Sequence, residues 1–162
     1  MIKAIMAVDD KGGVSKNGTM PWPKNSNDLK WFKKHTLNHV VIMGRKTWID
    51  PFMKPPLPNR INILATRKEK KNFPGADEYI DDNLVENTKM LSKKYNNLDI
   101  FVIGGPNILN QLFTLIETFY LTRIYGNFSC DNNINLSIIE NKMKLKEKIN
   151  CDSTCHFEIW ER

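Results

Sequence analysis

Short runs of apolar, often β-branched residues recur along the chain and are its clearest structural signal. Each run has the length of a buried strand and is bounded by polar, glycine or proline residues. The runs that predict strands are residues 2–8, 39–43, 61–66, 99–103 and 118–124, with a weaker one at 79–80. Apolar residues at helical spacing predict an amphipathic helix at 84–95. A second helix is predicted to begin with Pro106 in its first turn and to carry Ile108, Leu109, Leu112 and Phe113.

A further helix is predicted after the polar run Asn25-Ser26-Asn27, whose side chains suit an N-cap. Its spacing places Asp28, Leu29, Phe32 and Thr36 along one side, and its lysines mostly on the other. One carboxylate therefore stands at the head of a mainly apolar face. It either complements the positive end of the helix macrodipole or points into an apolar pocket, where it can bind a cationic or amidine-like group.

The last third of the chain alternates apolar and polar residues and predicts two antiparallel strands, at 144–150 and 154–160. Together with the earlier pattern, this indicates an α/β fold in a single domain, residues 1–162. We expect a central, mainly parallel twisted sheet with an antiparallel C-terminal edge strand and helices on both faces.

Two predicted strands end in glycine and lead directly into a helix. One junction is Gly44 before Arg45-Lys46-Thr47, and the other is Gly104-Gly105 before Pro106. Such junctions present free backbone N–H groups that bind anions, and Arg67 follows a third strand. Because ligands of parallel sheets bind at the carboxyl ends of the strands, these residues predict a site there. The glycines of the long loop 9–18 lack the Lys and Ser/Thr of a P-loop, and no G-x-G-x-x-G motif is present.

The composition is that of an ordinary globular protein, with 41% hydrophobic and 26% charged residues. The net charge of +6 is dispersed, so that an anionic small molecule explains it as well as nucleic acid does. Cys151 and Cys155 with His156 lack zinc-type spacing, and we expect no metal site. No signal peptide or membrane span is recognisable, which leads us to expect a cytoplasmic protein with reduced thiols.

Several short motifs, taken in order and spacing, resemble the dihydrofolate reductase family over nearly the whole chain. They are Ala7-Val8-Asp9, Met20-Pro21-Trp22, Asp28-Leu29-Lys30-Trp31-Phe32, Met43-Gly44-Arg45-Lys46-Thr47-Trp48, Leu57-Pro58-Asn59-Arg60, Ile103-Gly104-Gly105 and Leu121-Thr122-Arg123-Ile124. The resemblance implies reduction of dihydrofolate to tetrahydrofolate by hydride transfer from NADPH to the pterin imine carbon, with protonation of the adjacent nitrogen. It also implies inhibition by antifolates, and we expect a monomer that binds neither nucleic acid nor membrane.

The resemblance assigns the folate pocket residue by residue. Asp28 would bind the pterin's 2-amino group and ring nitrogen, with Thr122 bracing it, and Arg60 would pair with the glutamate carboxylate. The pocket would be lined by Ile5, Ala7, Leu29, Phe32, Leu57 and Ile103. Asp28, Trp22 and Thr122 would be the catalytic group.

The resemblance also implies a cofactor site. Arg45 and Arg67 would take the 2′-phosphate of NADPH, and Thr47 with Gly104-Gly105, a pair that usually carries a cis peptide, would lie near the pyrophosphate. Trp22 and the loop ending at Met20 would close over the nicotinamide. The full implied set is Ala7, Met20, Gly44, Arg45, Lys46, Thr47, Thr66, Arg67, Ile103, Gly104, Gly105, Asn107 and Ile108.

Some positions depart from the common pattern of the family. Ser15 stands where many members have a second loop glycine, and Leu109 replaces a frequent tyrosine. The segments 23–27 and 49–56 look longer than in short bacterial members. These departures bear on turnover and inhibitor affinity.

Three other functions compete with this interpretation. A pyrimidine reductase of riboflavin synthesis shares the fold and NADPH, but should lack both the Asp28 helix and the Leu57–Arg60 motif. A non-catalytic basic module for nucleic acid would need clustered bases with interleaved aromatics, whereas the lysines here are dispersed. A degenerate, non-catalytic relative is disfavoured by the presence of Asp28, Thr122 and Arg60 together.

Overall fold

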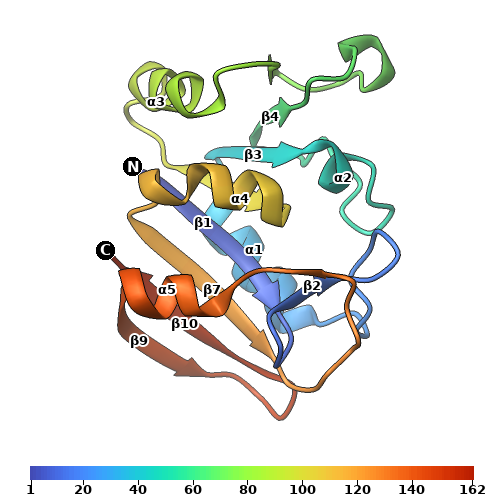
Figure 1. The fold of residues 1–162 in the computed structure, drawn as a ribbon, viewed down its shortest axis with the longest axis vertical. Helices are drawn as coiled ribbons and strands as arrows, with labels where there is room; N and C mark the ends of the chain where they lie inside the picture. Colours follow the sequence, from blue (N-terminus) through green and yellow to red (C-terminus); the bar gives the residue numbers. More distant parts are fainter.

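The computed structural model describes residues 1–162, which are organised around one eight-stranded sheet with the order β5-β4-β3-β6-β1-β7-β10-β9 (Figure 1). Neighbouring strands from β5 to β7 are parallel, while β10 is antiparallel to both β7 and β9. The strands are β1 Ile2–Val8, β3 Val40–Gly44, β4 Ile61–Ala65, β5 Glu78–Ile80, β6 Ile100–Gly104, β7 Thr118–Ile124, β9 Lys144–Asn150 and β10 Cys155–Glu161. The predicted mainly parallel sheet with an antiparallel C-terminal edge is confirmed.

Helices cover both faces of the sheet, as predicted. They are α1 Ser26–Thr36, α2 Arg45–Trp48, α3 Leu84–Lys94, α4 Pro106–Leu112 and α5 Leu136–Lys142. Side chains of α3, α4 and α5 pack in one apolar cluster with Ala4, Met6 and Val8 of β1. Those of α1 and α2 pack in a second cluster with Ile5, because successive side chains of a strand point to opposite faces.

The start of α1 follows from its sequence. Asn25 is the N-cap, and its side chain accepts a hydrogen bond from the backbone N–H of Asp28 at 3.1 Å. This places Asp28 in the first turn, on the side of α1 that faces the sheet. The longest helices, α1 and α3, have eleven residues each, and none is both long enough and apolar enough to cross a membrane.

Some elements differ from the sequence prediction. The loop after β1 contains a short strand, β2 Gly13–Ser15, which pairs with β8 Asn132–Asn133. Asp9 is buried there and accepts backbone hydrogen bonds from Gly13 and Phe128. Helix α5 and the 3-10 turns η1 Lys70–Asn72 and η2 Phe113–Leu115 were not predicted either. A three-residue strand leaves no periodicity to detect, and β2 forms only because a segment more than a hundred residues away lies beside it.

Candidate functional site

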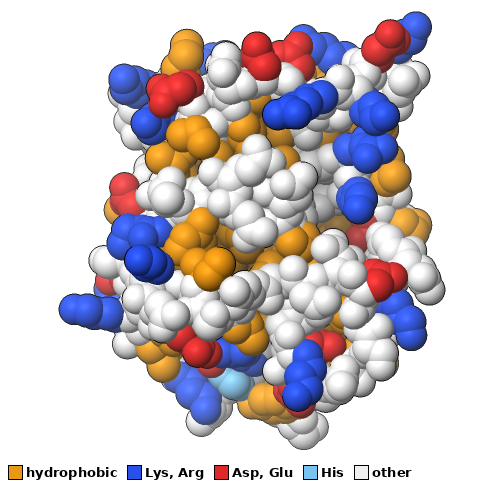
Figure 2. Space-filling model, in the orientation of Figure 1, with side chains coloured by type: hydrophobic (Ala, Val, Ile, Leu, Met, Phe, Trp, Pro, Cys, Tyr) orange, Lys and Arg blue, Asp and Glu red, His pale blue; other side chains and the backbone are white.

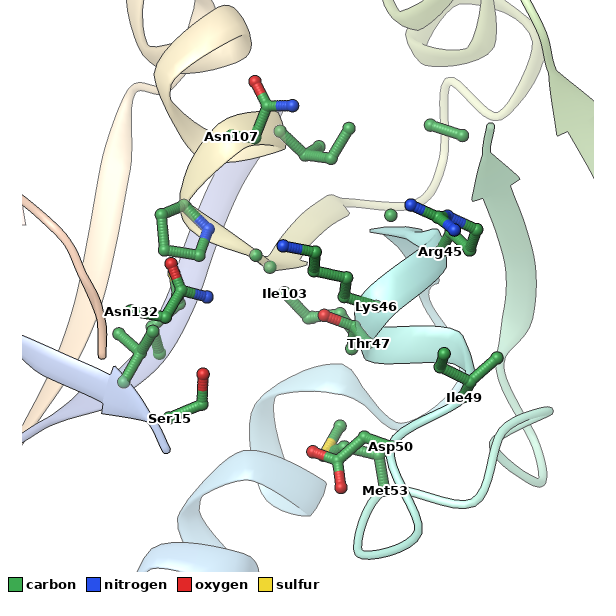
Figure 3. Close-up of a pocket in the computed structure, with 18 of the residues that line it drawn as sticks. Ser15, Arg45, Lys46, Thr47, Ile49, Asp50, Met53, Ile103, Asn107 and Asn132 are labelled. Carbon is green, nitrogen blue, oxygen red and sulfur yellow. The ribbon is translucent and has the colours of Figure 1, made fainter. Parts of the chain in front are cut away.

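A cleft of about 1290 Å³ runs along the carboxyl ends of β1, β3, β4, β5 and β6. Figure 3 shows side chains converging on it from α2, from the β6–α4 junction and from the segment around Asp50. Most residues of the expected folate and cofactor sites line it: Ile5, Ala7, Met20, Asp28, Leu29, Phe32, Gly44, Arg45, Lys46, Thr47, Thr66, Arg67, Ile103, Gly104, Gly105, Asn107 and Ile108. Trp22, Leu57, Arg60 and Thr122 do not line the cleft itself.

Asp28 is the one buried acid that α1 contributes to the cleft, and only 9% of its surface is exposed. No ion pair involves it. Burial raises the pKa of its carboxyl, and the nearby Thr122 hydroxyl opposes this rise. An acid that is buried without a cationic partner is suited to a ligand group that brings a positive charge or two N–H donors.

Behind this part of the cleft lie polar atoms that the protein leaves unpaired. The Thr122 hydroxyl, on β7, is buried and has no partner within hydrogen-bond geometry, and neither does the indole N–H of Trp31. The Thr122 hydroxyl thus influences Asp28 without a direct hydrogen bond. Trp22 and Leu57 are buried in the same apolar cluster as Ile5 and Ile103, so that they support the cleft lining from below.

Arg60 is held in place by its own neighbours. Its Nε donates to the carbonyl of Pro58 at 2.9 Å, and Nη1 donates to the Thr36 hydroxyl at 3.1 Å. Burial lowers the pKa of the guanidinium, which makes no ion pair within the protein. The remaining N–H groups of this oriented fork are available to a carboxylate from outside.

The two glycine junctions lie side by side in the sheet, where Met43 of β3 pairs with Gly104 of β6. A Cβ on Gly44 would lie 2.8 Å from Cγ1 of Ile108, and one on Gly104 would lie 3.2 Å from the Thr47 hydroxyl. Gly104 also has a φ of +132°, and the Gly104–Gly105 peptide is cis, as the resemblance implied. No side chain caps α2 or α4, so the backbone N–H groups of their first turns, which in α4 begin after Pro106, are not paired by side chains.

Basic side chains gather on one side of the cleft. Arg45, Lys46, Arg67 and Lys68 all line it, and none of them belongs to an ion pair. Lys46 extends from α2 toward the middle of the cleft in Figure 3. In Figure 2, Lys and Arg side chains crowd the area around α2 and the end of β4, with apolar surface beside them. Unpaired cations beside open N–H groups favour a multiply charged anion.

The loop 9–22 borders the cleft, and beyond the β2–β8 pairing and the bonds of Asp9 it is fastened at two further points. The backbone N–H of Asn17 donates to the carboxylate of Asp131 at 3.0 Å, and the backbone N–H of Asp131 donates to the carbonyl of Ser15 at 3.1 Å. The Thr19 hydroxyl donates to Asp50 at 2.9 Å. The part of the loop after β2, residues 16–19, is therefore held through a few polar contacts, which can break and reform at low cost.

Several lining residues were missed by the sequence interpretation, among them Asp50, Met53, Asp131 and Asn132. Asp50 and Met53 lie in the segment 49–56, which the sequence marked only as long. Asp131 and Asn132 belong to a polar loop whose approach to β2 depends on tertiary structure. Leu109, noted as a departure, is buried in the core under α4 and does not line the cleft.

Comparisons with known proteins agree with this geometry. A family model described as dihydrofolate reductase matches residues 1–162. The chain is 36% identical over 132 residues to a dihydrofolate reductase of Bacillus subtilis, covering 81% of this chain and 73% of that protein. It is 34% identical over 148 residues to the enzyme of Rattus norvegicus, covering 80% and 76%. A solved structure of dihydrofolate reductase from Enterococcus faecalis, complexed with NADP(H) and RAB-propyl, matches with a TM-score of 0.82 and 27% identity, covering 100% of this chain and 96% of that one.

Proposed function

The chain belongs to the dihydrofolate reductase family and reduces dihydrofolate with NADPH, and we propose that the cleft at the carboxyl ends of the parallel strands is where it does so. The observation that carries this proposal is the pairing of two unlike regions in one cleft. A buried, unpaired acid on an apolar wall lies at one end, and unpaired bases with open helix starts lie at the other. The first suits a pterin and the second suits phosphates.

The residues present fit NADPH. Gly44 and Gly104 let α4 and Thr47 pack closely beside the junctions, because a Cβ there would crowd Ile108 or Thr47, and the uncapped starts of α2 and α4 offer N–H groups to a pyrophosphate. We infer that Arg45 and Arg67 bind the 2′-phosphate, with Lys46 and Lys68 adding positive charge. The wider lining set, which includes Ala7, Met20, Thr47, Thr66, Ile103, Gly105, Asn107 and Ile108, would hold the rest of the cofactor.

Asp28 is proposed to anchor the pterin. Its carboxylate has two oxygens and no protein cation, so that it can accept hydrogen bonds from the 2-amino group and the adjacent ring nitrogen. Ile5, Leu29, Phe32 and Ile103 would enclose the ring, and Leu57 would support them. The buried hydroxyl of Thr122, which has no partner within the protein, would steady the carboxylate through a bridging water.

Arg60 is proposed to bind the glutamate tail of the substrate. Thr36 and Pro58 fix the plane of its guanidinium, and a planar fork matches the two oxygens of a carboxylate. This contact lies far from the reacting atoms in the substrate. It would therefore contribute to binding and orientation and leave the chemical step unchanged.

When bound, NADPH supplies the hydride that is added to the pterin imine carbon. The protein residues orient the ring, exclude water and favour protonation of the neighbouring nitrogen. We propose that the negative charge of Asp28 stabilises the protonated pterin, with water as the proton carrier. Trp22 and the loop 9–22 would close this end of the cleft through the Asn17–Asp131 and Thr19–Asp50 contacts.

The experiment follows the loss of NADPH absorbance with purified protein, with and without dihydrofolate. We expect oxidation of NADPH only when dihydrofolate is present, and its arrest by an antifolate. A riboflavin-pathway pyrimidine offered in place of dihydrofolate should give no turnover. Turnover of that pyrimidine without turnover of dihydrofolate would refute the assignment of substrate to this cleft.

We propose further that residues 1–162 act as one domain and as a monomer in the cytoplasm, without nucleic acid. The edge strand β9 carries exposed Lys144, Lys146 and Lys148, which oppose pairing with a second sheet. The opposite edge, β5, has only three residues. The three cysteines are free thiols, which suits a reducing compartment. Sedimentation at micromolar concentration tests the monomer.

A further inference from the structure

The turn between β9 and β10 carries two cysteines that face each other. Asn150 pairs with His156 across this hairpin, so continuing the register places Cys151 opposite Cys155. Cys155 belongs to the second apolar cluster and Cys151 packs against it, so both side chains point to the same face of the sheet. This arrangement lies outside the cleft, because none of the lining residues comes from the hairpin.

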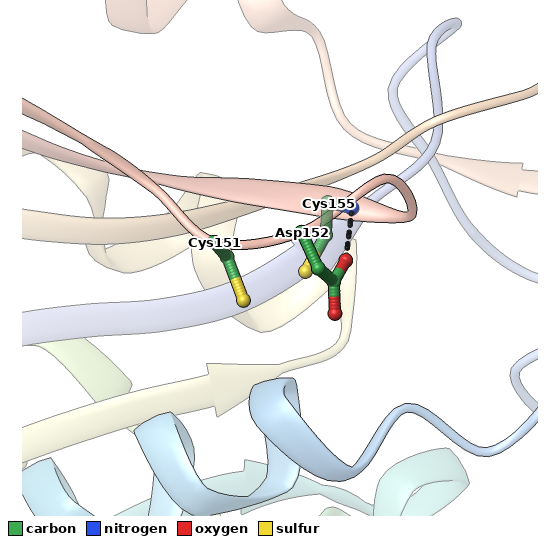
Figure 4. A group of neighbouring side chains, drawn as sticks. All are labelled: Cys151, Asp152 and Cys155. Carbon is green, nitrogen blue, oxygen red and sulfur yellow. Dashed lines mark hydrogen bonds between the residues drawn. The ribbon is translucent and has the colours of Figure 1, made fainter.

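A carboxylate completes the group. The two Sγ atoms and a carboxylate oxygen of Asp152 all lie within 4.8 Å of one another. Figure 4 shows the thiols and the carboxylate pointing to the same side of the hairpin. His156, which the sequence analysis considered together with the two cysteines and rejected for its spacing, is engaged elsewhere. Its Nδ1 lies 2.9 Å from the Tyr125 hydroxyl, and its Nε2 lies 2.8 Å from a carboxylate oxygen of Glu158.

We propose that Cys151, Asp152 and Cys155 bind one thiophilic divalent cation such as Zn²⁺ or Cd²⁺, with solvent completing the coordination. Thiolates select such ions over Mg²⁺ and Ca²⁺. With Zn–S bonds of about 2.3 Å, a tetrahedral site needs roughly 3.8 Å between its sulfur atoms. The group must therefore contract by no more than about 1 Å. Cys151 can supply this movement, because it is partly exposed and lies just outside β9.

The carboxylate is already held in its ionised form. Hydrogen bonds from the side chain and backbone of Thr154, and from the side chain of Asn27, lower the pKa of Asp152 to about 2. The backbone N–H of Cys155 also donates to it, at 3.2 Å. These bonds orient the carboxylate as outer-shell partners orient a metal ligand. They also connect the site to the start of α1, where Asn27 Nδ2 donates to Asp152 at 2.8 Å.

The thiols, by contrast, need a cation before they ionise. Burial, opposed by a hydrogen bond with Thr154 and assisted by the adjacent Cys151 and Asp152, raises the pKa of Cys155 to about 11. Binding must therefore displace protons, and the apparent affinity should increase with pH below the thiol pKa values. The increase should be about tenfold per pH unit for each proton released.

The test is a titration of the reduced, metal-free full chain with Cd²⁺, followed by sulfur-to-metal charge-transfer absorbance. We expect saturation at one Cd²⁺ per chain, affinity that increases with pH, and displacement by Zn²⁺. Cys151→Ser should lose about half of the band, because one thiolate remains, and should weaken binding at least tenfold. Asp152→Asn should keep the band and weaken binding.

Cys130→Ser is the matched control, because Cys130 is the third free cysteine and lies beside Asp9, away from the hairpin. It should bind Cd²⁺ as the wild type does. Cys151→Ser should keep wild-type reductase activity without metal, since the hairpin does not line the cleft. An absent band, a band that survives intact in Cys151→Ser, or a band lost in Cys130→Ser would overturn the proposal.

Discussion

Replacing Arg45 and Arg67 tests whether the basic side of the cleft selects NADPH over NADH. Arg45 is partly buried and Arg67 is exposed, and neither has an acidic partner that would compete with a phosphate. A charge-assisted contact from a partly buried group contributes about 1.5 kcal/mol or more. Solvent screening reduces the contribution of an exposed one to about 0.5–1 kcal/mol.

The two contributions sum to about 2–2.5 kcal/mol, which corresponds to a preference for NADPH of roughly 30–70-fold in kcat/KM. Arg45→Ala should reduce this preference about tenfold, and Arg67→Ala about two- to fivefold. Both variants should leave kcat/KM with NADH nearly unchanged, since NADH has no 2′-phosphate. Lys71→Ala is the control for loss of one positive charge, because Lys71 is exposed and paired with Glu69 outside the cleft.

The assay compares initial rates with NADPH and NADH at subsaturating cofactor and fixed ionic strength. High salt should weaken the preference, because exposed charges are screened. Equal kcat/KM for the two cofactors in the wild type would refute the reasoning, and so would a parallel loss with both cofactors in Arg45→Ala.

The remaining predictions concern the tail site, the loop and the stability of the fold. Arg60→Ala should raise KM for dihydrofolate far more than it lowers kcat. The kinetics of substrate analogues without the glutamate should not change in this variant. An equal loss of kcat/KM for dihydrofolate and for these analogues would show that Arg60 does not bind the glutamate tail. Hydrogen exchange of residues 9–22 should slow when NADPH and folate bind, and Asp131→Ala should speed this exchange by removing the contact with Asn17. Exchange that ligands leave unchanged would contradict the proposal that this loop closes over the cleft. Asp28→Asn should be more stable to urea than the wild type at neutral pH. Because burial raises the pKa of Asp28, the ionised carboxylate destabilises the fold above the unfolded-state pKa near 4, and this difference should disappear as the pH falls below that value; a difference independent of pH would contradict it.

Much of the sheet was predictable because its strands are buried on both faces. Runs such as Val40–Gly44 and Ile100–Gly104 are continuously apolar, and the alternating C-terminal strands matched the antiparallel pair β9 and β10. Short elements were not predictable in the same way, since β2 and β8 have three and two residues and depend on each other. Helix α5 did carry a usable signal, because Asn135 caps it and precedes Leu136 and Ile139.

The candidate site was predictable where a local pattern identified it. Asp28 was marked by its place on an apolar helix face, and Gly44 and Gly104 by strand-to-helix junctions, whereas Arg60 and Thr122 came only from the family resemblance. Asp50 and Asp131 could not be found, because their importance lies in contacts with Thr19 and Asn17 across the cleft. The sequence likewise could not predict that Cys151 lies opposite Cys155, because this placement follows from the register of the hairpin.

The central claim is that the Asp28 carboxylate promotes the chemical step, and the pH–rate profile of Asp28→Asn tests it most directly. The substitution keeps the shape of the side chain and removes its charge, so we expect the rate of hydride transfer near neutrality to fall by about 10²–10⁴. The rate should then increase as the pH falls, well below the pH at which the wild type levels off, because bulk acid supplies the protonated pterin that the amide cannot favour. Wild-type activity near neutrality, or a variant that binds folate and NADPH but stays inactive at every pH, would contradict the account.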